Sequence, residues 1–258
     1  MSIERGMPQA HARNMAGILS IVSVPIGHPR DLSLRAIDVL QSADTILCED
    51  LKPAHRLLHS LKIEKPLLPL NEHTEVAATD EALALLGEGK DLALISDAGT
   101  PLVADPGQRL VYRAIEADIE VTPVPGVSSI LAALVVSGFR SDTFYFAGML
   151  PREKFERKTA AARLAEREET IVLLEAPYRL AQLLDDLVEA FGTARRACVA
   201  VELTMPKERV HRGTLLALRD RFLARPFKGE YVVVIEGRRT RPHSSIQGGK
   251  RKSHRHAD

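Results

Sequence analysis

The sequence predicts an α/β protein built from two α/β domains, and three observations lead to this prediction. Short apolar runs alternate with helical patterns along most of the 258 residues. Most of the runs are continuously apolar, which is typical of strands covered on both faces. The alternation breaks at residues 138–150, where a charge-dense segment (residues 152–169) follows, and this break separates two parts of similar size.

Eight strands are expected, at residues 18–24, 45–48, 91–96, 119–124, 143–147, 170–175, 197–203 and 231–236. Helical stripes lie between them, and the clearest consists of Leu180, Leu183, Leu184 and Leu187. Two further stripes contain Leu34, Ile37 and Leu40, and Ala82, Leu85 and Leu86. Strands that alternate with helices favour largely parallel sheets. We expect a disordered N-terminal extension (1–16), an N-terminal α/β domain (17–138), a C-terminal α/β domain (139–237) and a basic disordered tail (238–258).

Composition excludes several classes of protein. No apolar run approaches the roughly 20 residues that a membrane-spanning helix needs. With only two cysteines, which lie far apart in the sequence, we expect no metal site. Residues 238–258 have a net charge of +6, which leaves −5 for the remainder of a chain whose total is +1. Such a tail suggests contact with a polyanion, usually RNA, although a solvated tail without a specific role is an equal alternative.

Three loops after predicted strands have an unusual composition. Residues 25–29 read Pro-Ile-Gly-His-Pro, residues 96–107 hold two glycines, two prolines and two aspartates, and residues 125–130 begin Pro-Gly-Val-Ser-Ser. Ligands of α/β proteins bind at the carboxyl ends of the strands, where such loops lie. A loop as long as residues 96–107 is usually functional.

These loops carry no fingerprint of a dinucleotide site, a P-loop or a hydrolase elbow, so enzymes of those kinds are disfavoured. Their composition, with little fixed positive charge, instead suggests backbone groups presented to a neutral or weakly charged ligand. S-adenosylmethionine, whose sulfonium is cationic, is compatible with this pattern.

The sequence resembles the tetrapyrrole methylase superfamily, and within it the small-subunit ribosomal RNA 2′-O-cytidine methyltransferases. The resemblance covers residues 17–237 and rests on short blocks in the expected order. The blocks are residues 24–27, 34–36, 48–50, 72–73, 96–107, 125–126, 175, 179–180, 202–204 and 228–230. It implies two α/β domains with S-adenosylmethionine in the cleft between them, usually in a homodimer.

The resemblance also implies which residues contact the methyl donor. From the three loops of the first domain these are Pro25, Gly27, Asp97, Gly99, Thr100, Pro101, Val103, Ser128 and Ser129. Glu175, Ala176 and Pro177 are expected to close the site from the second domain. Some of these residues have a simpler interpretation, since Pro101 could serve only to shape its turn.

The acceptor side departs from the ribosomal RNA pattern. Leu51-Lys52 replaces Thr-Arg, Asn71 and Thr74 replace a histidine and an asparagine, Ala176 replaces a serine, and Met205 replaces a lysine. A 2′-hydroxyl must lose its proton during the reaction, so a nearby carboxylate or imidazole could assist. The candidates are Glu49, Asp50, Glu72 and His73, although Asp50 could instead cap a helix.

Three functions are compatible with these features. The first is a cytoplasmic methyltransferase that acts on ribosomal RNA of the small subunit, with the tail 238–258 as an RNA contact. The second is a methyltransferase of the same fold that acts on a tetrapyrrole or another non-RNA acceptor. The third is a non-catalytic homologue that binds the donor or RNA.

Overall fold

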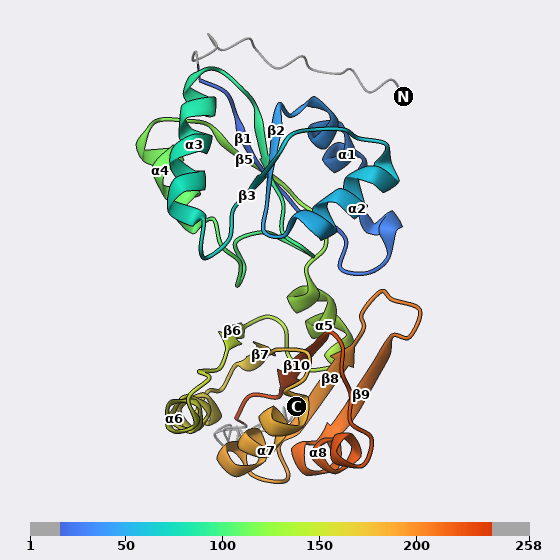
Figure 1. Cartoon of the computed structure of the whole chain (residues 1–258). Coiled ribbons are helices and arrows are strands. Elements are labelled where there is room, and N and C mark those ends of the chain that lie inside the picture. Colours follow the sequence, from blue (N-terminus) through green and yellow to red (C-terminus); the bar gives the residue numbers. More distant parts are fainter. Residues whose placement is uncertain (1–15, 239–258) are drawn as a thin grey trace, which may run out of the picture.

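The computed structural model describes residues 16–238, which form two five-stranded sheets with helices on both faces (Figure 1). The first sheet has the strand order β3-β2-β4-β1-β5 and the second the order β6-β7-β10-β8-β9. The prediction of two α/β units is therefore confirmed. The expected extension and most of the basic tail lie outside the described residues.

All strand pairs of the first sheet are parallel. Its strands are β1 (Leu19–Val22), β2 (Thr45–Cys48), β3 (Leu67–Pro69), β4 (Leu92–Leu94) and β5 (Val121–Val124). One face packs against α1 (Leu34–Ser42) and α2 (Leu51–Leu61), and the other against α3 (Glu75–Gly87) and α4 (Gln108–Glu116). In α1 the buried residues are Ala36 and Leu40, so the expected stripe is wrong at Leu34, which is 81% exposed.

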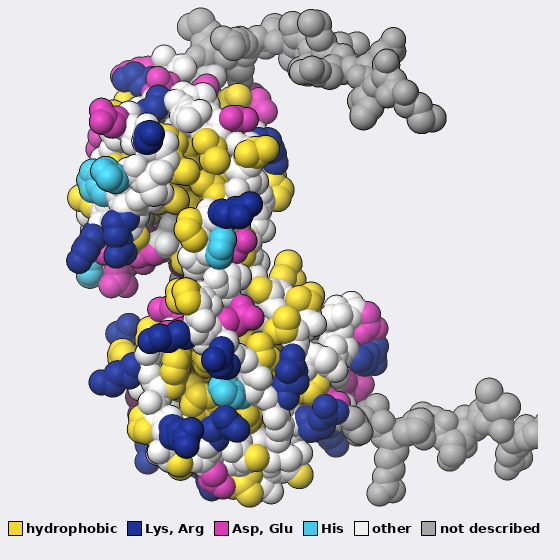
Figure 2. Space-filling view, turned by 90° about the vertical axis from the view of Figure 1, so that its right-hand side faces the viewer, with side chains coloured by type: hydrophobic (Ala, Val, Ile, Leu, Met, Phe, Trp, Pro, Cys, Tyr) yellow, Lys and Arg dark blue, Asp and Glu magenta, His cyan; other side chains and the backbone are white. Residues whose placement is uncertain are grey.

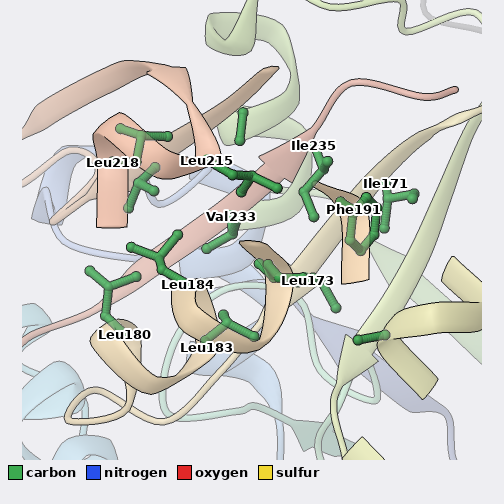
Figure 3. Close-up of a cluster of buried hydrophobic side chains, with 14 of the residues drawn as sticks. Ile171, Leu173, Leu180, Leu183, Leu184, Phe191, Leu215, Leu218, Val233 and Ile235 are labelled. Atoms are coloured by element: carbon green, nitrogen blue, oxygen red, sulfur yellow. The ribbon is translucent and has the colours of Figure 1, made fainter. Parts of the chain in front are cut away.

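The second sheet is covered by three helices on one face and by one on the other. Its strands are β6 (Phe144–Met149), β7 (Thr170–Leu174), β8 (Arg196–Val201), β9 (Arg209–Thr214) and β10 (Tyr231–Ile235). The first face packs against α6 (Lys154–Ala165), α7 (Leu180–Phe191) and α8 (Leu215–Ala224). Figure 3 shows this core, where the predicted stripe of α7 points at the sheet; all four of its leucines are buried, which confirms that prediction.

The expectation of largely parallel sheets is wrong for the second sheet. Strand β10 runs antiparallel to β7 and β8, and β8 runs antiparallel to β9, so only β6 and β7 are parallel. Continuously apolar strands such as β8 and β10 report burial on both faces, but burial does not fix the direction of a strand. Strands β3 and β9 were not expected either, because β3 has three residues and β9 is a polar edge strand.

Helix α5 (Ser129–Ser137) packs on the second sheet, although the sequence suggested that it belongs to the first domain. Its residues Ile130, Ala133 and Leu134 contact the apolar face formed by β7, β8 and β10. We therefore propose a domain boundary near residues 125–128, where the chain leaves β5, in place of residue 138.

Candidate active site

Three loops meet at the carboxyl ends of β1, β4 and β5. Thr100 Oγ1 donates a hydrogen bond to the Val127 carbonyl oxygen (3.0 Å) and lies 3.1 Å from Ser23 Oγ. Strands β1 and β4 are neighbours, but α1 and α4, which follow them, lie on opposite faces of the sheet. Such a switch point opens a crevice in which α/β proteins bind ligands.

The loop between β4 and α4 folds back onto the loop after β1. Val24 and Gly99 exchange two backbone hydrogen bonds, of 2.8 and 3.1 Å. Gly99 has φ +80°, and a Cβ there would lie 3.2 Å from the Ile26 side chain. Leu102 and Ala104 also adopt left-handed conformations, with φ of 72° and 69°. Strained residues of this kind are concentrated at functional sites, where the surrounding structure holds them in place.

A cavity of about 270 Å³ lies between the two halves of the molecule. The first half lines it with the loops after β1 and β4, and the first turn of α5 lines it where the two halves join. The second half lines it with the ends of β6, β7 and β8 and with the start of β10. Seven of the residues expected to contact the donor are in the lining: Asp97, Gly99, Thr100, Val103, Ser128, Ser129 and Glu175.

The other five expected donor residues lie next to this lining. They are Pro25, Gly27, Pro101, Ala176 and Pro177. Gly27 faces the loop between β8 and β9, and a Cβ on it would be 2.6 Å from Met205 Cγ. The backbone N–H of His28 donates to Thr204 Oγ1 (3.0 Å) beside it. These two contacts join the halves of the molecule at one rim of the cavity.

Several lining residues of the second half were missed by the sequence analysis. They are Met149, Leu174, Ala200, Leu203, Glu230, Tyr231 and Val232. Those near the carboxyl ends of β6, β7 and β8 could have been found, because these strands were predicted. Glu230 had a signal too, since it belongs to the block 228–230. Tyr231 and Val232 had none, because β10 is antiparallel to its neighbours and its amino end therefore lies at the cavity.

Glu175 provides a buried charge in the wall of the cavity. Its side chain is 3% exposed, and Oε1 accepts a hydrogen bond from the Ala176 N–H (2.9 Å) and lies 3.5 Å from Arg179 Nη1. Its Oε2 is buried and has no hydrogen-bond partner among the described residues. A buried carboxylate oxygen without a donor is costly, so this atom is suited to a ligand that brings a donor or a positive charge.

An acidic groove adjoins the cavity and shares Asp97 and Ala104 with it. All four residues considered as proton acceptors line this groove: Glu49, Asp50, Glu72 and His73. Asp50 Oδ1 accepts from the Lys52 N–H (2.8 Å) and so caps α2, as its simpler interpretation predicted. His73 Nε2 lies 3.3 Å from Glu72 Oε1, and both side chains are more than 80% exposed.

Burial and mutual repulsion raise the pKa of three carboxyl groups near the shared wall. The pKa of Asp105 rises to about 6, mainly through burial and then through the charge of Asp97. Burial is also the largest cause for Glu49, whose pKa is raised further by Asp105 and Asp97. The pKa of Asp97 is raised in the same way, although its hydrogen bond from the Asp50 N–H (3.2 Å) opposes the shift.

Two of the departures from the ribosomal RNA pattern shape the turn before α3. Asn71 Oδ1 accepts from the N–H groups of His73 (3.0 Å) and Thr74 (3.2 Å). Thr74 Oγ1 donates to the Pro69 carbonyl oxygen (3.0 Å). Leu51 is exposed and lines the acidic groove. Leu51 and Asn71 therefore lie along the acidic groove, whereas Ala176 and Met205 lie beside the cavity between the halves.

Within residues 16–238, no helix is long and apolar enough to span a membrane. Within the same residues, no group of three or more His, Cys, Asp or Glu side chains is arranged to hold a metal ion.

The fold and the site define a two-part α/β protein that holds a small ligand between its halves. Residues 19–219 match the tetrapyrrole (corrin/porphyrin) methylases. The ribosomal RNA small subunit methyltransferase I of Synechocystis sp. is 42% identical over 221 residues, which cover 86% of this chain and 79% of that protein. The protein of the same name from Xylella fastidiosa (strain Temecula1) is 42% identical over 237 residues, which cover 91% of this chain and 87% of that protein.

A solved structure shows the same fold. The uroporphyrin-III C-methyltransferase of Thermus thermophilus, complexed with S-adenyl homocysteine, superposes with a TM-score of 0.63 at 18% identity. The match covers 85% of this chain and 97% of that one. The chain belongs to the tetrapyrrole methylase family. The expectation of a methyltransferase from this superfamily is thus confirmed.

Proposed function

We propose that this chain transfers a methyl group from S-adenosylmethionine to the 2′-hydroxyl of a cytidine ribose in small-subunit ribosomal RNA. The observation that carries the proposal is the buried Glu175 carboxylate in the wall of the cavity, whose Oε2 has no hydrogen-bond partner within residues 16–238. The acceptor follows from relatives named ribosomal RNA small subunit methyltransferase I, which are 42% identical over most of the chain.

The charge of the cavity supports a cationic donor. Its described lining includes the acidic residues Asp97, Asp105, Glu175 and Glu230, and contains no Lys, Arg or His. The sulfonium and the α-ammonium of S-adenosylmethionine are both positive, and Glu175 Oε2 is available to one of them. The seven predicted residues in the lining would contact the donor. The five beside it would hold the loops in shape.

The reaction is an in-line displacement. The ribose oxygen attacks the methyl carbon, the carbon–sulfur bond breaks, and the donor leaves as neutral S-adenosylhomocysteine. Holding oxygen, carbon and sulfur in line is the main task of the protein. Among the four candidates for accepting the hydroxyl proton, Glu49 is favoured because it lines the groove next to the cavity and because burial raises its pKa, which makes a carboxylate a better base. We infer that Asp50, which caps α2, positions Glu49.

A homodimer is part of the proposal. Leu131 and Val135 lie one turn apart on α5 and are 51% and 73% exposed. An apolar helix face of this kind is suited to a second copy of the chain. We also propose that the tail 238–258 contacts the RNA and that the protein works in the cytoplasm, where ribosomal RNA is available.

The decisive experiment measures both methyl transfer to RNA and binding of the methyl donor. The protein is incubated with labelled S-adenosylmethionine and small ribosomal subunits from a strain that lacks the native enzyme. We expect label in the RNA, and none when the acceptor ribose is 2′-deoxy. Glu175→Gln should weaken donor binding by about tenfold in calorimetry, whereas Glu189→Gln, an exposed glutamate on α7, should not. Donor binding without transfer to any RNA would contradict the proposal.

A further inference from the structure

Charge is distributed unequally between the two halves of the molecule. Residues 16–128 contain 9 Lys or Arg and 17 Asp or Glu, whereas residues 129–238 contain 18 Lys or Arg and 15 Asp or Glu. Figure 2 shows Lys and Arg side chains gathering over the lower half, on the side where Figure 1 places β9 and α8. The acidic groove beside the cavity repels phosphates, so the phosphate backbone that flanks the acceptor ribose must be held elsewhere.

Four cations form what we call the β9–α8 basic face: Lys207, Arg209, Arg221 and Arg225. All four are exposed, and within the described part of the chain none forms an ion pair with a carboxylate. Their charges are thus available to an anion. Neighbouring Arg219 differs, because it pairs with Asp220 at 2.8 Å.

His211 shows that the members of this face are close together. Its Nδ1 lies 3.3 Å from Arg221 Nη1, and its ring packs edge-on against Phe222 with centroids 5.3 Å apart. Its pKa is lowered by burial first and then by the positive charges of Arg221 and Arg209. Arg225 follows one turn after Arg221, and its N–H donates to the Arg221 carbonyl oxygen (3.0 Å).

The basic face begins at the rim of the cavity. Arg209, the first residue of β9, pairs with Val201, and Leu203, two residues further along, lines the cavity. Thr204, in the same connection, accepts the hydrogen bond from His28 that joins the two halves. A strand of RNA that lay along β9 would therefore lead to the donor.

We propose that the β9–α8 basic face binds the phosphate backbone of the RNA acceptor and directs its ribose towards the cavity. This inference rests on the proposed function, because it assigns a docking surface to that reaction. Contacts of this kind position a nucleic acid without reading its sequence, and each one makes binding more dependent on salt.

The test uses the full chain with Arg209→Gln, Arg221→Gln and Arg225→Gln combined. The matched control is Arg163→Gln, an exposed arginine on α6 at the opposite edge of the sheet. Binding of unmodified small-subunit ribosomal RNA is measured over a series of salt concentrations. Calorimetry with S-adenosylmethionine shows that the donor site is intact.

We expect the triple variant to bind the RNA at least tenfold more weakly, with a log–log salt slope less steep by about two to three. The corresponding triple lysine variant should keep most of the RNA affinity and most of the salt slope, because lysine retains the positive charge that holds a phosphate. KM for RNA should rise more than kcat falls. Unchanged RNA affinity and salt slope in the triple glutamine variant would overturn the docking surface alone. A wild-type protein that neither binds nor methylates RNA would overturn the proposed function, and the docking surface with it.

Discussion

Gly27 lies so close to Met205 that a Cβ on it would be 2.6 Å from Met205 Cγ, 2.8 Å from Thr204 Oγ1 and 2.9 Å from the Leu203 carbonyl oxygen. Glycine at this position lets the loop after β1 contact the loop between β8 and β9. The contact crosses the cavity rim, so the geometry of the donor site depends on it.

Gly27→Ala should therefore weaken S-adenosylmethionine binding by about tenfold and lower the free energy of unfolding by about 1–3 kcal/mol, because the two loops must separate. Calorimetry and urea unfolding measure the two effects. Gly87→Ala is the control, since a Cβ there meets nothing within 4 Å. If the two variants have the same donor affinity and the same free energy of unfolding, the close approach at Gly27 contributes to neither.

Thr100→Val should lower the free energy of unfolding by about 1–2 kcal/mol, because it removes the hydroxyl that bonds to the Val127 carbonyl oxygen. Donor affinity should also fall, since Thr100 and the neighbouring Ser128 line the cavity. Thr100→Ser keeps the hydroxyl and should retain most of the affinity. If the serine and valine variants bind the donor equally, the hydrogen bond does not hold the loops together.

Asp105 should make stability depend on pH. Its pKa rises from 3.8 to about 6 in the folded protein, mainly through burial, so its ionised form is disfavoured there. The destabilisation is absent below about pH 4, grows as the pH rises to about 6 and is constant above. Asp105→Asn should raise the free energy of unfolding by on the order of 2 kcal/mol at about pH 8 and hardly at all at about pH 4. Urea unfolding across this range checks the prediction, which a difference independent of pH would contradict.

Asp186→Ala should lower the free energy of unfolding by about 3–5 kcal/mol, because it leaves the charge of Arg157 buried without its partner. The two side chains are 4% and 6% exposed, and Arg157 Nε lies 2.6 Å from Asp186 Oδ2. Replacing both residues by leucine should cost less than the single change. Asp185→Ala, at an exposed neighbour on α7, is the control. A double variant as unstable as the single one would show that the loss of packing, and not the unpaired charge, is responsible.

Deletion of residues 239–258 should weaken RNA binding and make its salt dependence less steep, because the segment holds six Lys or Arg and one Asp. Donor affinity should not change, since every residue predicted to contact the donor lies within residues 25–177. An unchanged salt slope would show that the tail takes no part in binding.

The sequence by itself determined the features that depend on local pattern. Continuous apolar runs identified β2, β7 and β10, because strands buried on both faces must be apolar along their length. The composition of residues 96–107 and 125–130 marked loops that approach a ligand, and these loops line the cavity. The blocks of residues in these loops also indicated the methylase family.

Only the tertiary structure decided how distant segments meet. The antiparallel direction of β10 placed Glu230–Val232 at the cavity, and α5 joined the second sheet. Gly27 was predicted to contact the donor, yet its nearest neighbours belong to the loop after β8. Strand direction and contacts between loops are set by packing over the whole chain. A sequence pattern, in contrast, indicates only which residues are buried and where the chain forms turns.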